Sequence, residues 1–207
     1  MNAYETKQLL VKTAQQAYMD KMFAATSGNL SIYDRENGRM YITPGSFPYM
    51  EMTPEDVMVI DLDGNVLEGP HKPSSEWRLH AAVYRAKEDV SAVVHTHSPY
   101  ATAFSINNLP IPVVLYEIVY FLGGTIPCAE GAIPGTDAVG ENCVKVLDGV
   151  NGCLMGNHGT LAVADTLPRA YTRAVYIEDA AKAYSLALSH GPVRVIESKD
   201  VEKILGK

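Results

Sequence analysis

"SAVVHTHSP", residues 91–99, joins an apolar run to two histidines and a proline. The run is rich in β-branched valine, which predicts a β-strand. Residues 75–87, which precede it, carry apolar side chains at helical spacing, and Pro99 suits the first turn of another helix over residues 99–106. A strand between two helices indicates an α/β fold.

Helices and strands continue to alternate in both directions from this stretch. Helical spacing predicts further helices over residues 3–24, 136–150 and 167–190, and from Ser198 onward. Apolar runs predict strands over residues 30–33, 40–45, 57–61, 66–69, 111–118 and 193–197, with two more within 152–165. We therefore expect a single domain over residues 1–207, in which helices cover both faces of a mixed or antiparallel sheet.

The composition excludes several classes of protein. The net charge is -7, and the lysine and arginine residues are not clustered. Both features argue against a nucleic-acid partner. No apolar run approaches the ~20 residues that span a membrane, and the first ten residues do not resemble a secretion signal, so we expect a cytoplasmic protein without membrane contact. Cys128, Cys143 and Cys153 lack CxxC spacing, which favours reduced thiols over a thiolate metal site.

Three histidines have the placement of metal ligands. His95 and His97 are two residues apart in a strand, so their side chains point to the same face. His158 lies in the tight turn of "MGNHGT", after another apolar strand. Three imidazoles and one carboxylate form a common catalytic zinc site, and Glu76 is the candidate carboxylate. The alternative is a structural role, which we expect for His71, His80 and His190.

Glu76 itself lies in "HKPSSEWRLHAAV", residues 71–83, where a helix is expected to begin. One interpretation is purely structural, with Ser74 or Ser75 as the helix cap and Glu76 in the first turn. Another is that the serines and the exposed amides of the helix start hold an anion such as phosphate, with Glu76 beside it.

Seven short segments, in order along nearly the whole chain, resemble the class II aldolase/adducin family. They are "SGNLS" (27–31), "ITPGSFPY" (42–49), "PSSEWRLH" (73–80), "AVVHTHS" (92–98), "IPVVLYE" (111–117), "IPCAEGAIPGT" (126–136) and "GNHGT" (156–160). Each segment is weak evidence alone, but seven in the same order are highly specific.

The resemblance implies a three-layer α/β/α sandwich with a mainly antiparallel central sheet. It also implies a homotetramer with active sites at the subunit interfaces and one Zn²⁺ per subunit, although imidazole ligands also suit other divalent metals. The implied metal ligands are Glu76, His95, His97 and His158. Glu76 would act as the base, and Tyr116 of a neighbouring subunit as the acid. The implied phosphate pocket consists of Gly28, Asn29, Thr43, Gly45, Ser74 and Ser75.

The activity implied by the resemblance is that of a zinc-dependent aldolase. It would reversibly cleave a 1-phosphoketose, such as L-fuculose 1-phosphate, into dihydroxyacetone phosphate and a short aldehyde such as L-lactaldehyde. The C-terminal tail is shorter than that of the fuculose-phosphate enzymes, so 5-deoxyribulose 1-phosphate or a related deoxypentulose phosphate is an alternative substrate.

Two other functions stay open at this point. A ribulose-5-phosphate 4-epimerase would share the metal chemistry, but the related epimerases carry an aspartate about six residues before "IPC", where this chain has Tyr120. An adducin-like interaction domain would have no need of the three histidines and Glu76.

Overall fold

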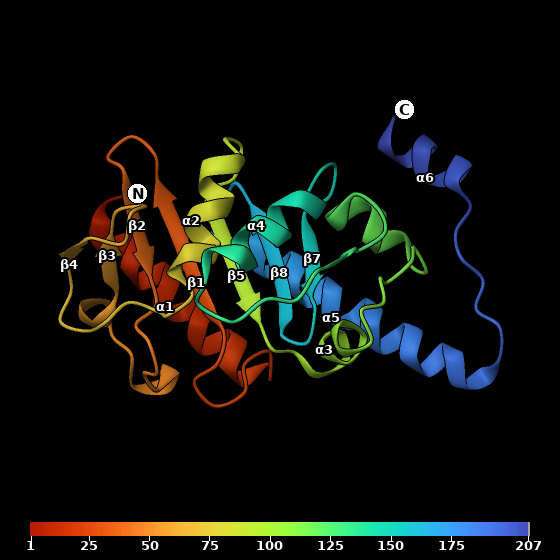
Figure 1. The fold of residues 1–207 in the computed structure, drawn as a ribbon, viewed down its shortest axis with the longest axis horizontal. Helices are drawn as coiled ribbons and strands as arrows, with labels where there is room; N and C mark the ends of the chain where they lie inside the picture. The colour runs from red at the N-terminus through yellow and green to blue at the C-terminus, as the bar shows by residue number, and fades with distance from the viewer. Residues whose placement is uncertain (207) are drawn as a thin grey trace.

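An eight-stranded sheet forms the centre of the computed structural model, which describes residues 1–206 (Figure 1). The strand order across the sheet is β4-β3-β2-β1-β5-β8-β7-β6. The strands are β1 (Asn29–Asp34), β2 (Arg39–Ile42), β3 (Met58–Ile60), β4 (Val66–Glu68), β5 (Ala92–Thr96), β6 (Cys128–Ala129), β7 (Gly152–Met155) and β8 (Gly159–Ala164). All neighbours pair antiparallel except β6 and β7, so the sheet is mixed and the prediction of a mainly antiparallel sheet is confirmed.

Helices cover both faces of this sheet, as predicted (Figure 1). They are α1 (Ala3–Met19), α2 (Trp77–Ala86), α3 (Pro99–Ile106), α4 (Asp137–Val146), α5 (Leu167–His190) and α6 (Ser198–Leu205). Alternate residues of β5 show the two faces: Val94 packs in one buried cluster with α1, α3 and α5, whereas Val93 packs in another with α2 and α4. The result is a three-layer α/β/α sandwich.

Local sequence explains where the first helix begins and ends. The side chain of Asn2 accepts a hydrogen bond from the backbone N–H of Glu5, whose carboxylate in turn accepts one from the N–H of Asn2. This reciprocal capping box satisfies backbone donors at the helix start. The helix ends at Met19, earlier than predicted, because Lys21 has a positive φ of 60° that an α-helix does not allow.

Two predicted strands are wrong. Residues 111–118 contribute only an isolated bridge between Ile111 and Ile126, after which the chain forms a π-helical turn, Ile118–Leu122. Pro110 and Pro112 have no N–H to donate to a neighbouring strand, and apolar composition alone does not separate a strand from other buried backbone.

The second wrong strand is residues 193–197, which form no ladder of hydrogen bonds with another strand. A backbone hydrogen bond of 2.8 Å joins the N–H of Ile196 to the carbonyl of Val113, and the Ile196 side chain packs against the buried core. A ladder requires a partner strand in register, and the partner expected nearby, residues 111–118, does not form.

Within residues 1–206, none of the helices has the length and apolar character needed to cross a membrane.

Candidate active site

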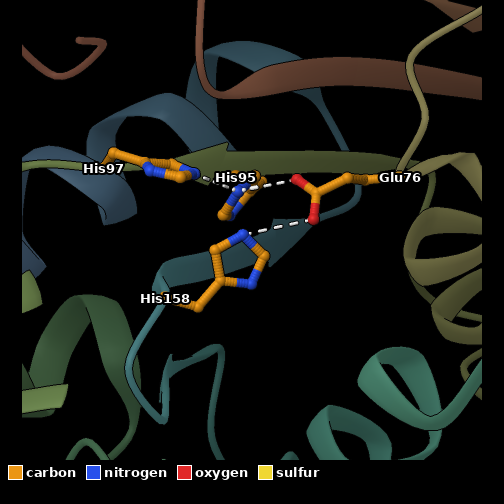
Figure 2. Close-up of side chains that lie close together, drawn as sticks. All are labelled: Glu76, His95, His97 and His158. Atoms are coloured by element: carbon orange, nitrogen blue, oxygen red, sulfur yellow. Dashed lines mark hydrogen bonds and ion pairs between the residues drawn. The ribbon is translucent and has the colours of Figure 1, made fainter. Parts of the chain in front are cut away.

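The histidines of residues 91–99 lie where β5 leaves the sheet. His95 and His97 point to the same side, as predicted, with their Nε2 atoms 2.9 Å apart (Figure 2). The ring of His158 lies 4.8 Å from that of His95 and 5.1 Å from that of His97, centroid to centroid. His158 reaches this position from the turn between β7 and β8. The next residue, Gly159, passes so close to β5 that an added Cβ would meet the carbonyl oxygen of Thr96 at 2.3 Å.

Glu76 completes the cluster from the side opposite His97, at the start of α2 (Figure 2). Its Oε2 lies 2.9 Å from Nε2 of His95, and its Oε1 lies 3.2 Å from Nε2 of His158. One donor atom from each of Glu76, His95, His97 and His158 lies within 4.8 Å of all the others. The structure thus brings together all four residues predicted as metal ligands.

The chemistry of these donors fits a divalent metal ion. Nδ1 of His95 lies 2.9 Å from the carbonyl oxygen of Thr160, which only accepts, so Nδ1 carries the proton of this hydrogen bond and Nε2 faces Glu76 and His97. Oε1 of Glu76 is buried without a hydrogen-bond partner, and Nε2 of His158 lies 3.2 Å from it as an ion-pair neighbour. Several acceptors aimed at one point are the surroundings that a bound cation requires.

The ionisation states favour the same conclusion. Burial lowers the pKa of His97 to about 4, and the neighbouring His95 and His158 act in the same direction, so the ring is neutral at pH 7. Burial alone would raise the pKa of the Glu76 carboxyl, but its contacts with His158 and His95 outweigh burial and hold this pKa well below its usual range. Metals bind neutral imidazole and ionised carboxylate, which are the forms of His97 and Glu76 here.

A cavity of about 360 Å³ opens beside the cluster. Glu76, His97 and His158 form part of its wall, together with five of the six residues predicted to bind phosphate: Gly28, Asn29, Gly45, Ser74 and Ser75. The sixth, Thr43, does not line the cavity. It is buried, and its hydroxyl accepts a hydrogen bond of 3.3 Å from the backbone N–H of Leu30.

The start of α2 differs from the prediction. The helix begins at Trp77, and the N-cap is Glu76 rather than Ser74 or Ser75. The hydroxyl of Ser74 still accepts a hydrogen bond from a backbone N–H, that of Glu76, at 3.3 Å. Glu76 has a non-helical backbone, with ψ of 15°, and its carboxylate is turned to the histidines instead of capping the helix. The carboxylate of the N-cap residue is thus engaged by His95 and His158, which are remote in sequence.

Tyr116, predicted as the catalytic acid, lies outside the cavity that holds the four ligands. Its side chain is 54% exposed, and it lines a different hollow together with residues 194–197 of the C-terminal segment. One chain therefore does not bring Tyr116 to the metal cluster.

Comparison with known proteins decides the family. Residues 8–185 match the family described as "Class II Aldolase and Adducin N-terminal domain". The chain belongs to this family. A 5-deoxy-D-ribulose 1-phosphate aldolase of Bacillus thuringiensis is 36% identical over 196 residues, which cover 92% of each chain. An L-fuculose phosphate aldolase of Escherichia coli is 37% identical over 183 residues, or 88% of this chain and 84% of the relative.

A solved structure shows the same relationship. An L-fuculose 1-phosphate aldolase superposes with a TM-score of 0.92 at 35% identity, covering 96% of this chain and 93% of the other. These matches place the chain among the enzymes of the class II aldolase family, which are metal-dependent lyases.

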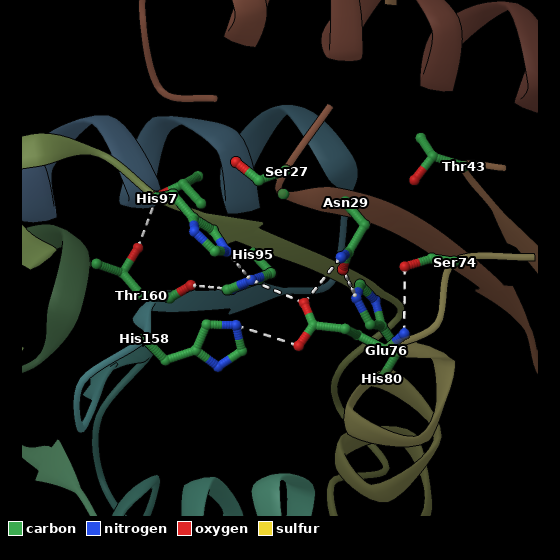
Figure 3. A network of polar contacts seen from close by, with 12 residues as sticks. Ser27, Asn29, Thr43, Ser74, Glu76, His80, His95, His97, His158 and Thr160 are labelled. Atoms are coloured by element: carbon green, nitrogen blue, oxygen red, sulfur yellow. Dashed lines mark hydrogen bonds and ion pairs between the residues drawn. The ribbon is translucent and has the colours of Figure 1, made fainter. Parts of the chain in front are cut away.

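Sequence reasoning did not predict the partner of one buried histidine. His80, predicted to be structural, is fully buried, and its Nε2 lies 2.5 Å from Oδ1 of Asn29, which in turn contacts Glu76 (Figure 3). A signal was present, because His80 follows Glu76 by four residues and so lies one helical turn beyond it.

Proposed function

We propose that this class II aldolase is a zinc enzyme that reversibly cleaves a 1-phosphoketose into dihydroxyacetone phosphate and a short aldehyde. The observation that carries the proposal is the cluster of Glu76, His95, His97 and His158 beside a cavity whose other residues are small and mostly polar. Three imidazoles and a carboxylate suit zinc with room for substrate. When bound, the zinc ion would supply a Lewis acid that stabilises the negative charge developing on substrate oxygens.

The polar end of the cavity is the proposed phosphate pocket. Neither lysine nor arginine lines it, so an anion has to be held by neutral donors. Ser74, Ser75 and Asn29 provide such donors beside the start of α2, where backbone N–H groups and the helix dipole favour negative charge. Thr43 is left out of the direct contacts, and its bond to Leu30 supports β1 behind the pocket.

Glu76 is the proposed base. In the condensation direction its carboxylate takes a proton from the carbon of dihydroxyacetone phosphate that lies next to the ketone. The electron pair left on that carbon forms the new bond to the aldehyde carbon, and the aldehyde oxygen becomes an alkoxide. Oε1 is suited to take the proton, since it is buried at the cavity wall and accepts no hydrogen bond. Cleavage runs through the same steps in reverse.

The alkoxide needs a proton, and we assign its donor to Tyr116 of a neighbouring subunit in a homotetramer. The assignment is supported by the position of Tyr116, which is exposed and away from the cavity of its own chain. Tyr120, one turn further on, is 69% exposed. Two exposed aromatic residues on one short segment are typical of a surface that another subunit covers.

Two substrates are the leading candidates. L-Fuculose 1-phosphate and 5-deoxyribulose 1-phosphate are the compounds named for relatives of nearly equal identity, 37% and 36%. Both yield dihydroxyacetone phosphate and differ in the aldehyde released. The 4-epimerase reaction is disfavoured by Tyr120, which stands where the related epimerases have an aspartate.

A coupled assay for dihydroxyacetone phosphate tests the proposal. Zinc-loaded protein would be given each of the two ketose phosphates, with and without a chelator. Chelator-sensitive release is expected, and the ratio of the two values of kcat/KM identifies the preferred aldehyde. Isomerised pentulose phosphate without cleavage, or zinc-loaded protein that releases no dihydroxyacetone phosphate from either compound, would refute the proposed reaction.

A further inference from the structure

A chain of buried polar side chains leads from the interior of the protein to Glu76. The hydroxyls of Tyr84 and Ser31 lie 2.6 Å apart, and the hydroxyl of Ser31 lies 2.6 Å from Nδ1 of His80. Nε2 of His80 lies 2.5 Å from Oδ1 of Asn29, and Nδ2 of Asn29 lies 3.1 Å from Oε2 of Glu76 (Figure 3). None of the five side chains belongs to a residue more than 7% exposed.

Secondary structure aligns the members of this chain. His80 and Tyr84 are four residues apart on α2 and therefore lie on the same face of the helix. Asn29 and Ser31 are two residues apart on β1 and therefore point to the same side of the sheet. Because α2 packs against β1, residues of the helix and of the strand alternate along the hydrogen-bonded series.

The position of every proton in the chain is determined by its end at Glu76. An ionised carboxylate only accepts hydrogen bonds, so the amide of Asn29 must turn its NH₂ group to Glu76 and its Oδ1 to His80. Oδ1 also only accepts, so Nε2 of His80 carries the proton. Nδ1 of His80 is then an acceptor, to which Ser31 donates its hydroxyl hydrogen, and Tyr84 must donate to Ser31.

The pKa of His80 agrees with this arrangement. Burial is the main cause that lowers this pKa to about 3. The neighbouring His95 also lowers the pKa, and the smaller effect of Glu76 raises it. The ring is therefore neutral at pH 7, as the single proton on Nε2 requires.

We propose that His80 is a positioning residue. It fixes the orientation of the Asn29 amide, so that the NH₂ group of Asn29 points to Glu76 and to the substrate cavity. If the amide rotated by a half turn, its carbonyl oxygen would face the carboxylate at about the same distance, and two acceptors would repel each other. The NH₂ group has two hydrogens, and only one is needed for Glu76. Since Asn29 lines the cavity, the second hydrogen is available to an oxygen of the substrate.

The substrate part of this inference rests on the proposed function, but the part that concerns Glu76 does not. A residue that orients a metal-binding group commonly changes metal affinity by about 10- to 100-fold when it is replaced. The zinc affinity of the protein is therefore a readout of His80 that does not depend on which reaction is catalysed.

The tautomer of His80 is the first test. In protein labelled with ¹⁵N-histidine, two-bond ¹H–¹⁵N spectra distinguish a ring protonated on Nε2 from one protonated on Nδ1. The signals of His80 are assigned by their absence from His80→Gln protein. The Nε2–H form, unchanged from pH 8 to pH 5, is expected. A ring protonated on Nδ1, or on both nitrogens at pH 7, would overturn the proposal.

Two amide variants form a matched pair for the second test. The amide of His80→Gln reaches about as far as Nε2 and keeps a donor for Asn29, whereas that of His80→Asn reaches only to the place of Nδ1 and can bond Ser31 alone. Zinc affinity is measured on metal-free protein by competition with a chelator. We expect His80→Asn to lose at least about tenfold in affinity and His80→Gln to stay within about threefold of the parent protein. Thermal unfolding of both metal-free variants verifies that they are folded.

The outcomes separate positioning from simple packing. Equal zinc affinities in the two variants, whether both are normal or both are weakened to the same degree, would overturn the positioning role. If the pair differs as expected but no ketose phosphate is cleaved, the role of His80 stands and the proposed reaction fails. With an active enzyme, the same pair should differ in KM for the ketose phosphate, because the second amide hydrogen of Asn29 contacts substrate.

Discussion

The carboxylate of Glu76 and the imidazole of His95 meet at 2.9 Å, Oε2 to Nε2, and both residues are buried. Glu76 is the N-cap residue of α2, and His95 is the penultimate residue of β5. The cluster therefore depends on how the start of a helix is placed beside the end of a central strand. Because both elements are fixed by a core on each face of the sheet, the ligand atoms are held in place before any metal binds.

Replacing Glu76 by glutamine should remove the proposed base while keeping the shape of the side chain. General-base catalysis contributes about 10²- to 10⁴-fold, so kcat for release of dihydroxyacetone phosphate should fall by a factor in this range. Exchange of the carbon-bound proton of dihydroxyacetone phosphate with D₂O, followed by NMR, should fall in parallel. Glu88→Gln, an exposed change beyond the other end of α2, is the control. Normal proton exchange in zinc-loaded Glu76→Gln protein would exclude Glu76 as the base.

Zinc should stabilise the folded protein, since the four ligands come together only on folding. A ligand present at 100 times its Kd adds about 2.7 kcal/mol to the free energy of unfolding. Differential scanning fluorimetry should therefore show a rise in Tm when zinc is added to chelator-treated protein. The rise should be lost in His158→Ala and retained in His190→Ala, which changes an exposed histidine at the end of α5. An equal rise in the two variants would place the bound zinc elsewhere.

Sequence periodicity was sufficient for the ligands but not for their surroundings. The two-residue spacing of His95 and His97 and the turn around His158 follow from local geometry, and the structure brings these side chains together. Asn29 and His80 lie on different elements, and although the spacing places His80 one turn beyond Glu76, no local pattern reports that His80 meets Asn29 across the core. Periodicity detects burial, and for the same reason it misread residues 111–118 as a strand.

The metal-free protein should lose stability in mild acid. Burial lowers the pKa of His80 to about 3 and that of His97 to about 4, whereas both histidines titrate near 6.5 when unfolded. Between about pH 6.5 and pH 4 the unfolded chain therefore binds more protons than the folded one, and the free energy of unfolding falls as the pH falls. Above pH 6.5 these two residues contribute no further slope.

Denaturant titrations of metal-free protein at several pH values measure this dependence. One such histidine contributes a slope of up to about 1.4 kcal/mol per pH unit, so His80→Gln should flatten the curve by about this amount between pH 4 and 6. His190→Gln should leave it unchanged, because that residue is exposed. An unaltered slope in His80→Gln would mean that His80 does not stay neutral in the folded protein.

Two inactive variants should restore activity to each other when they are mixed. Tyr116→Phe removes the proposed acid, and kcat should fall by about 10²- to 10⁴-fold. If each site takes Glu76 from one subunit and Tyr116 from its neighbour, some sites in a mixed oligomer of Glu76→Gln and Tyr116→Phe subunits contain both intact residues. In a random equal mixture each of the two residues is intact with a chance of about one half, so about a quarter of the sites contain both.

Exchange of subunits under mild denaturant, followed by the assay for dihydroxyacetone phosphate, measures the gain. Mixtures in which exchange is proven by mass spectrometry but which stay as inactive as their components would show that Tyr116 does not act across an interface. The structure favours recovery, because Tyr116 is exposed and lies in a different hollow from the cavity beside Glu76 in its own chain.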